Sequence, residues 1–107
     1  IHGAITAAKK TEKKVAARLD IDQLRRLREA TGIPLVLHGG TGIRREYIQA
    51  AIANGIAKIN VATAIRQPYE ALRNQSVEAA QEAVYAATRE LVTDELAIAG
   101  NAAALTR

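Results

Sequence analysis

The pattern of apolar and polar residues predicts short strands that alternate with helices over the first two thirds of the chain. Three short apolar stretches are expected to be strands or strand ends: Ile1–Ile5, Leu35–Leu37 and Ala57–Val61. Pro34 supports the second of these, because proline cannot continue the helix expected before it. Residues 7–18 are rich in Lys and Ala and predict a loop or a loose helical turn.

Two helices are predicted between these strands. Asp20 is a good N-cap for a helix that ends near Gly32, and Arg44–Asn54 predicts a second helix that stops at Gly55. Their inward faces are expected to carry Ile21, Leu24 and Leu27 in the first helix, and Ile48, Ala51 and Ile52 in the second.

The last third of the chain predicts two further helices. Thr63 is the expected N-cap of the first, in which Pro68 is either tolerated near the start or introduces a kink. Ser76 is expected to cap a long helix that reaches about Ala99 and ends at Gly100. This helix has apolar residues every seven positions, at Val77, Val84, Leu91 and Ile98, with Ala80 and Ala87 between them.

Short strands that alternate with helices indicate parallel βαβ units and therefore an α/β fold. Three strands cannot close a barrel, and by themselves they leave a small open sheet with bare edges. We therefore expect the C-terminal portion of a (β/α)8 barrel, about strands 6–8, over residues 1–74. A helical extension is expected over residues 75–107.

Composition limits the independent core and the class of protein. The 107 residues include no Phe, Trp or Cys, and three Tyr supply all of the 3% aromatic content. A core of this size normally holds more aromatic side chains, so we expect a fragment whose surfaces another segment or subunit completes. The absence of Cys excludes disulfides and thiolate metal sites. No apolar run approaches the roughly 18–20 residues of a membrane span, which predicts a soluble cytoplasmic protein without membrane association.

The net charge of +4 raises the question of a nucleic-acid partner. No aromatic residues are interleaved with the basic ones for base stacking, and the arginines alternate with apolar residues at helical spacing. Solvated helix faces are therefore the better interpretation, and we expect no nucleic-acid partner. A mild positive field suits a phosphorylated substrate equally well.

The segment Pro34–Gly42 has the clearest chemical character in the chain. An apolar strand ends at His38, and a loop containing Gly39, Gly40 and Gly42 follows at once. Such glycines leave backbone N–H groups uncovered, as a phosphate-binding loop requires. Imidazole is the side chain most used for metal binding and for proton transfer near neutral pH. The segment therefore predicts a metal or proton-transfer site next to a phosphate site.

The two histidines of the chain, His2 and His38, are both followed by glycine at an expected strand end. Parallel neighbouring strands would bring both imidazoles to one rim, where they can serve as metal ligands. Alternatively, each imidazole only forms a hydrogen bond with its own loop. A catalytic zinc usually has three protein ligands, and no third ligand follows a recognisable strand here.

The end of the third expected strand supplies Asn60 and Thr63. The Asn60 amide both donates and accepts, which suits it to hold a substrate hydroxyl or an enediolate oxygen. Thr63 can offer its hydroxyl and its N–H to a phosphate at a helix start. The alternative is a strand-end Asn and a capping Thr without a ligand.

Several segments in this order resemble one enzyme family. These segments are Ile1–Gly3, Leu19–Asp22, Thr31–Gly42 and Gly55–Thr63. They resemble the C-terminal part of the class II, metal-dependent ketose-bisphosphate aldolases. The resemblance runs in register from residue 2 to about residue 66, and more loosely to residue 100.

The resemblance implies a metal site and a substrate site. His2 and His38 would be two of the three zinc-ligating histidines of the family, and a monovalent cation is a further candidate cofactor. Asn60 would contact the substrate near the reacting carbon as the catalytic residue of this segment. The phosphate of dihydroxyacetone phosphate would lie against Gly3, Gly39, Thr41 and Thr63, and the loop glycine Gly40 belongs to the same expected site.

The implied activity is zinc-dependent, reversible aldol cleavage of fructose 1,6-bisphosphate or tagatose 1,6-bisphosphate. The products would be dihydroxyacetone phosphate and glyceraldehyde 3-phosphate, and the enzyme would be a homodimer or homotetramer. The third histidine and the acidic residue of the family belong to earlier strands, so this chain alone is not expected to be active. The sequence Asn60-Val-Ala-Thr63 resembles the tagatose-bisphosphate branch of the family, because Ala62 stands where many fructose-bisphosphate enzymes carry Asp or Asn. The alternative is a non-catalytic phosphate-binding or oligomerisation fragment.

Overall fold

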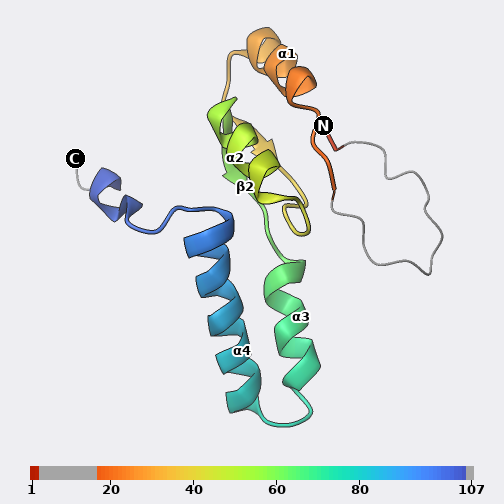
Figure 1. Cartoon of the computed structure of the whole chain (residues 1–107), viewed down its shortest axis with the longest axis vertical. Coiled ribbons are helices and arrows are strands. Elements are labelled where there is room, and N and C mark those ends of the chain that lie inside the picture. The colour runs from red at the N-terminus through yellow and green to blue at the C-terminus, as the bar shows by residue number, and fades with distance from the viewer. Residues whose placement is uncertain (3–16, 106–107) are drawn as a thin grey trace, which may run out of the picture. The chain divides into compact units, whose positions relative to one another are not determined.

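The computed structural model describes residues 1–2 and 17–105, which fall into two compact units that meet in the sequence at Val61 and Ala62. The first unit contains helix α1 (Ile21–Thr31), strand β1 (Leu35–Leu37), helix α2 (Arg45–Ala53) and strand β2 (Ile56–Ile59). The second contains helix α3 (Thr63–Leu72), helix α4 (Val77–Glu90), the π-helical turn η1 (Leu91–Glu95) and the 3₁₀ helix η2 (Asn101–Leu105) (Figure 1).

Helix α1 begins where the sequence predicts it. The Asp20 carboxylate accepts the N–H of Gln23 at 2.9 Å, and Gly32 ends the helix in the left-handed region at φ 64°. Leu19 and Leu24 occupy the two positions of a hydrophobic staple across this N-terminus, and both are buried. Local chemistry therefore decides both ends of α1.

Strands β1 and β2 pair in parallel, which confirms the βαβ unit around α2. Leu35 lies opposite Ile56 and Leu37 opposite Ile59, with a register shift between the first and second pairs. Of the first expected strand, Ile1–Ile5, the structure describes only residues 1–2, and these do not join the sheet. An isolated antiparallel bridge instead joins His2 to Leu19, and the N–H of Asp20 donates to the carbonyl of Ile1.

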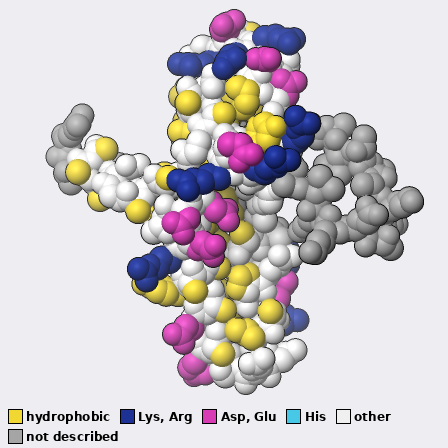
Figure 2. All heavy atoms as spheres, in the orientation of Figure 1, with side chains coloured by type: hydrophobic (Ala, Val, Ile, Leu, Met, Phe, Trp, Pro, Cys, Tyr) yellow, Lys and Arg dark blue, Asp and Glu magenta, His cyan; other side chains and the backbone are white. Residues whose placement is uncertain are grey.

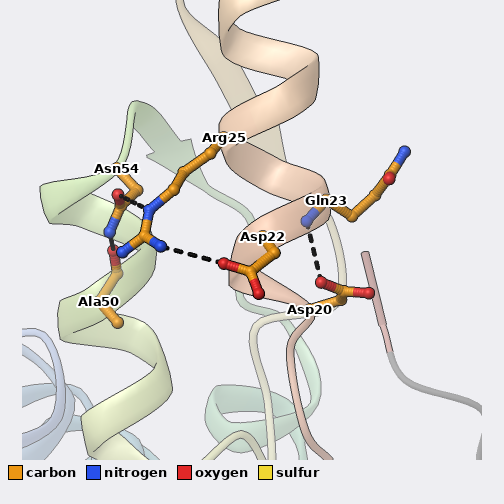
Figure 3. A network of polar contacts seen from close by, with 6 residues as sticks. All are labelled: Asp20, Asp22, Gln23, Arg25, Ala50 and Asn54. Carbon is orange, nitrogen blue, oxygen red and sulfur yellow. Dashed lines mark hydrogen bonds and ion pairs between the residues drawn. The ribbon is translucent and has the colours of Figure 1, made fainter.

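Helices α1 and α2 are linked by one polar network, which Figure 3 shows. Arg25 donates Nε–H to Oδ1 of Asn54 at 2.9 Å and also pairs with Asp22 at 3.0 Å. Asn54 in turn donates to the carbonyl of Ala50 at 2.7 Å. The network holds the end of α2 against α1, next to the apolar contacts beneath.

The core of the first unit consists of aliphatic side chains from each of its elements. These side chains are Leu19, Leu24, Leu37, Ile43, Ile48, Ala51 and Ile56. Three of the expected inward residues, Leu24, Ile48 and Ala51, are buried, whereas Leu27 and Ile52 are each 39% exposed. The expectations for Leu27 and Ile52 were therefore wrong, because the packed faces of α1 and α2 are narrower than their runs of apolar residues.

In the second unit, α3 and α4 lie side by side as a helical hairpin (Figure 1). Helix α3 runs through Pro68, and its N-cap is Ala62 rather than Thr63, which is the first helical residue. The carbonyl of Ala62 accepts the first helical N–H groups, so the helix begins one residue earlier than the Thr predicts. No side chain caps this end.

Helix α4 begins at its predicted cap and ends earlier than predicted. The Ser76 hydroxyl accepts the N–H of Ala79 at 3.0 Å. The α-helix stops at Glu90 and changes to π-helical hydrogen bonding, in which Leu96 donates to Leu91 at 2.9 Å. Ala97 then adopts φ 52°, which ends the helical path before the predicted Gly100.

The predicted apolar stripe of α4 is buried only in part. Ala80 is fully buried and Leu91 is 6% exposed, whereas Val77 is 54% and Ile98 is 42% exposed. Packing against α3 therefore uses the centre of the stripe and leaves its two ends uncovered. No helix in the part of the chain that the structure describes is long and apolar enough to span a bilayer.

Acidic and basic side chains are interspersed over the face drawn in Figure 2. Exposed ion pairs join Asp22 to Arg25, Arg44 to Glu46, and Arg66 to Glu70. Pairs of this kind contribute little to stability because water screens them. Their main consequence is a surface of mixed sign.

Candidate functional site

The ends of β1 and β2 meet as the parallel strands predict. His38 directly follows β1, and Asn60 directly follows β2. The ladder continues past both strands, because Asn60 donates its N–H to Leu37 at 2.9 Å and Gly40 donates its N–H to Asn60 at 2.9 Å. These backbone bonds place the two site residues next to each other.

The side chains of Asn60 and His38 are themselves in contact. Nδ2 of Asn60 lies 3.1 Å from Nδ1 of His38. An amide nitrogen only donates, so Nδ1 of His38 must carry the lone pair in this arrangement. Asn60 is half-buried and His38 is exposed, which leaves the pair accessible from solvent.

His2 reaches the same place from the start of the chain. Its Nε2 lies 2.7 Å from the carbonyl oxygen of His38, and its backbone bridges to Leu19. The N–H of Asp20 donates to the carbonyl of Ile1 at 2.8 Å, which holds this segment in place. Leu19 and Asp20 thus position the His2 segment, a role that was not predicted from the sequence. The signal available for it was an apolar residue directly before a helix cap.

The donor set fits part of a zinc site. A carbonyl only accepts, so His2 carries its proton on Nε2, and Nδ1 keeps the lone pair that a metal needs. Metal-ligating histidines usually donate their second ring nitrogen to a carbonyl or carboxylate in this way. Among residues 1–2 and 17–105, no cluster of three or more His, Cys, Asp or Glu side chains could hold a metal ion. The His2 ring thus lies next to the backbone of His38, without a third ligand in the described part. The one lone pair of a neutral His38 ring accepts from Asn60 here, so a metal held by His38 would replace that contact.

The glycine-rich loop has two different kinds of glycine. Gly39 and Gly42 adopt φ 65° and 78°, the left-handed region that favours glycine. Gly40 is buried, and its N–H is bonded to Asn60 within the chain. Thr41 lies between Gly40 and Gly42 and is half-buried.

Two of the predicted phosphate-binding residues, Gly3 and Thr63, are not among the described residues of the first unit. Gly3 lies outside the described residues. Thr63 belongs to the second unit, as the first residue of α3. Their roles therefore stay predictions.

A cavity of about 230 Å³ lies beside the histidines in the first unit. His2 and His38 line it together with apolar side chains from α1, β1 and β2, among them Leu24, Leu35 and Val36. The site is therefore polar at the strand ends and apolar along the strands.

The Fructose-bisphosphate aldolase class-II family matches residues 1–103. The chain belongs to this family. It is 56% identical over 46 residues to the fructose-bisphosphate aldolase of Geobacillus stearothermophilus, an alignment that covers 43% of this chain and 16% of that protein. The enzyme of the same name from Streptococcus pneumoniae serotype 4 is 61% identical over 46 residues, covering 42% and 16%.

A solved structure agrees with the family. This chain matches the crystal structure of the YdjI aldolase from Escherichia coli K12 with a TM-score of 0.59 and 33% sequence identity. The match covers 70% of this chain and 33% of that one. The chain therefore corresponds to about a third of the length of this structural relative, and the aligned segment to a sixth of the two sequence relatives. The observed fold is mixed α/β with a small parallel sheet.

Proposed function

We propose that this chain supplies part of the active site of a class II aldolase. The enzyme would reversibly cleave a ketose 1,6-bisphosphate into dihydroxyacetone phosphate and glyceraldehyde 3-phosphate. One observation carries the proposal: His2, His38 and Asn60, which are distant in the sequence, are joined by hydrogen bonds at the ends of two parallel strands. Their meeting in a chain of this family favours a shared catalytic role.

His2 and His38 would hold the zinc ion that is general in class II aldolases. When bound, zinc supplies Lewis acidity toward the substrate carbonyl oxygen. The tautomer of His2 suits this role, because its Nε2–H is already used by the carbonyl of His38. A third ligand has to come from outside the described residues.

Asn60 would orient the substrate next to the reacting carbon. A neutral His38 ring has one lone pair, so zinc held by His38 would replace the contact with Asn60 and leave the Asn60 amide free for a substrate hydroxyl. Gly39, Thr41, Thr63 and Gly3 would bind a substrate phosphate through N–H and hydroxyl groups. Phosphate binding of this kind uses remote contacts to hold the reacting carbons in place.

The prediction of which substrate epimer the enzyme cleaves depends on the residue at position 62. Ala62 follows Val61 in a sequence that resembles the tagatose-bisphosphate branch, whereas both sequence relatives are fructose-bisphosphate aldolases. We therefore propose fructose 1,6-bisphosphate or tagatose 1,6-bisphosphate as the substrate. Cleavage rates with purified fructose 1,6-bisphosphate and tagatose 1,6-bisphosphate measure the preference directly.

The fold proposal is that β1 and β2 belong to a (β/α)8 barrel. Val36 is apolar, lies in the middle of β1 and is 45% exposed, as expected of a strand whose neighbours are missing from the sheet. The structural match to the YdjI aldolase supports this proposal. A homodimer or homotetramer is also proposed, and light scattering of the full-length gene product measures it.

The deciding experiment is metal removal and return in the full-length gene product. EDTA treatment should abolish aldol cleavage of a ketose bisphosphate, and Zn²⁺ should restore it. Absence of activity in the zinc-loaded gene product would overturn the aldolase proposal. Retained binding of inorganic phosphate in that inactive protein would instead favour a non-catalytic phosphate-binding role.

A further inference from the structure

We propose that Lys58 is a positioning residue of the candidate site. In the barrel its ammonium group pairs with a carboxylate directly beneath Asn60, and this carboxylate comes from a strand outside the described residues. The inference deepens the proposed function, and it rests on the proposal that β1 and β2 belong to a (β/α)8 barrel. It requires neither a bound zinc ion nor a particular ketose bisphosphate.

The two faces of the β1–β2 sheet are packed differently. Leu37 and Ile56 belong to the core of the first unit and are 2% and 7% exposed. Val36 is apolar, yet it is 45% exposed, because successive side chains of a strand point to opposite faces. His38 follows Val36 by two residues and therefore leaves β1 on the same, uncovered face. The candidate site thus lies at the end of the face that this chain leaves uncovered.

A register shift in the ladder places Lys58 on this uncovered face. Val36 lies opposite Lys58, and Ala57 has no partner in β1 because the register shifts there by one residue. Without the shift, Ala57 would lie opposite Val36, and Lys58 would lie opposite Leu37 on the packed face. Bulges of this kind re-aim side chains and are common next to active sites. The shift therefore turns a lysine from the core toward the site.

The same shift places Lys58 directly beneath the site. It also brings Asn60 beside His38, since Leu37 lies opposite Ile59 in the shifted register. Asn60 follows Lys58 by two residues, so both side chains leave β2 on the same face, with their Cα atoms about 6.6 Å apart along the strand. Lys58 therefore belongs to the layer of side chains below Asn60 and His38.

Lys58 has no counter-charge in the part of the chain that the structure describes. The ion pairs among residues 1–2 and 17–105 do not include it, and its side chain is exposed here. The interior of a (β/α)8 barrel, however, is filled by packed layers of side chains. A lysine is almost never fully buried in such a place unless an opposite charge pairs with it. Closure of the barrel therefore requires a carboxylate next to Lys58.

The direct alternative is that Lys58 binds a substrate phosphate. The predicted phosphate-binding residues Gly39, Thr41 and Thr63 all follow the ends of β1 and β2, whereas Lys58 lies within β2. The ammonium group would have to pass Asn60 to reach a phosphate beyond the strand ends. The position of Lys58 in the strand therefore favours a carboxylate in the interior of the barrel.

The pair matters for catalysis because it fixes the strand that carries Asn60. Removing one partner of a buried ion pair leaves an uncompensated charge in the interior. The unpaired carboxylate then either admits water or displaces β2, and Asn60 moves with the end of the strand. Misplacement of an orienting group by about 1 Å lowers the rate by up to about 100-fold.

Amine labelling tests the burial of Lys58 without changing it. The full-length gene product is treated with acetic anhydride, both folded and in guanidinium chloride, and mass spectrometry measures acetylation of Lys58. The folded protein should react at least about 10-fold more slowly at Lys58, because reaction then requires local opening. Arg26→Lys, at an exposed position on α1, supplies a control lysine that should react at similar rates in both states. Equal rates for Lys58 in the two states would overturn the proposal.

Kinetics of the zinc-loaded, full-length gene product test the positioning role. Lys58→Met keeps the length of the side chain without its charge, and it should lower kcat about 10- to 100-fold with zinc still bound. Lys58→Arg keeps the charge, so its kcat should be at least about 5-fold above that of Lys58→Met. In the Asn60→Ala background, Lys58→Met should have little further effect. An unchanged kcat in Lys58→Met, or additive losses in the double variant, would contradict the positioning role.

Two further outcomes keep the test decisive. The inhibition constant of inorganic phosphate should stay within about 2-fold of wild type in Lys58→Met, since the phosphate donors are untouched. A loss of phosphate affinity of about 10-fold or more would overturn the proposal in favour of direct phosphate binding. If Lys58→Met does not fold, Lys58→Arg decides, because failure of this variant to fold would show that the charge is not what the position requires.

The labelling result is independent of aldolase activity. A protected Lys58 in a zinc-loaded protein that cleaves no ketose bisphosphate would support burial of the pair while the proposed function fails. A reactive Lys58 in an active aldolase would overturn the inference while the proposed function stands.

Discussion

His2 donates its ring Nε2–H to the carbonyl oxygen of His38 at 2.7 Å, although 36 positions separate the two residues. The contact joins a side chain at the start of the chain to the backbone after β1. Replacing the side chain of His38 therefore leaves the acceptor in place, whereas replacing His2 removes the donor. The two histidines are thus related but not equivalent.

Replacement of either histidine should remove zinc from the full-length gene product. We expect His2→Ala and His38→Ala each to weaken zinc affinity by more than about 100-fold, because even residues behind the ligands change affinity by 10- to 100-fold. Zinc stoichiometry after dialysis, measured by mass spectrometry, checks this. Arg26→Ala, at an exposed position on α1, is the control and should keep full stoichiometry. Zinc retained in both histidine variants would contradict the assignment of His2 and His38 as ligands.

Asn60→Ala should lower kcat about 100-fold with zinc still bound, because it removes a group that orients the substrate. Steady-state kinetics of ketose-bisphosphate cleavage, with zinc measured in the same sample, checks this. Asn54→Ala is a matched control, since Asn54 bonds to Arg25 between the two helices and not to the site. It should lower the melting temperature without changing kcat. Equal kcat values in the two variants would argue against a substrate contact for Asn60.

Asp20→Ala should destabilise the protein by about 1 kcal/mol, because it removes the side-chain cap of α1. Asp20→Asn keeps an acceptor oxygen and should behave nearly as wild type. The midpoint of urea unfolding measures the difference. Asp22→Ala removes only an exposed ion pair with Arg25, and its effect should stay within about 0.5 kcal/mol. An Asp22 effect as large as the Asp20 effect would show that charge, and not capping, matters here.

Ala80→Leu should destabilise the α3–α4 hairpin by about 1–3 kcal/mol, since Ala80 is fully buried and leaves no space for a larger side chain. Ala86→Leu places the same side chain at an exposed position on the same helix. Its effect should stay within about 0.5 kcal/mol. Thermal unfolding of both variants compares them. A neutral Ala80→Leu would indicate that the hairpin is loosely packed.

The first unit could be predicted in detail because its elements depend on local chemistry. Asp20 and Gly32 bound α1 through a side-chain cap and a left-handed residue, and both are readable from residue type. β1 occupies the predicted positions, and β2 begins one residue before the prediction and ends two residues before it. The rule that parallel strands end at one edge then also predicts that His38 and Asn60 are neighbours.

The wrong predictions concern the start of α3 and the end of α4, which depend on hydrogen bonding and packing rather than on residue type. Thr63 is a good capping residue, yet Ala62 is the N-cap and Thr63 the first helical residue, because the carbonyl of Ala62 accepts the first N–H groups. The apolar stripe of α4 continues to Ile98, but the change to π-helical hydrogen bonding at Leu91 and the left-handed Ala97 end the helix earlier. Periodicity identifies a face without fixing how far a neighbour covers it.

The sequence by itself determined the family, the helix caps Asp20, Gly32 and Ser76, and the βαβ unit, because these follow from short-range patterns. It also identified the side chains able to take part in chemistry. Only the tertiary structure decided which groups engage one another: His2 with the carbonyl of His38, Asn60 with the ring of His38, and Gly40 with the carbonyl of Asn60. The sequence presented Gly39, Gly40 and Gly42 as one glycine-rich loop. The close approach of Ile59 and Val61 to Gly40 distinguishes it from the other two, since steric crowding between distant segments leaves no local signature.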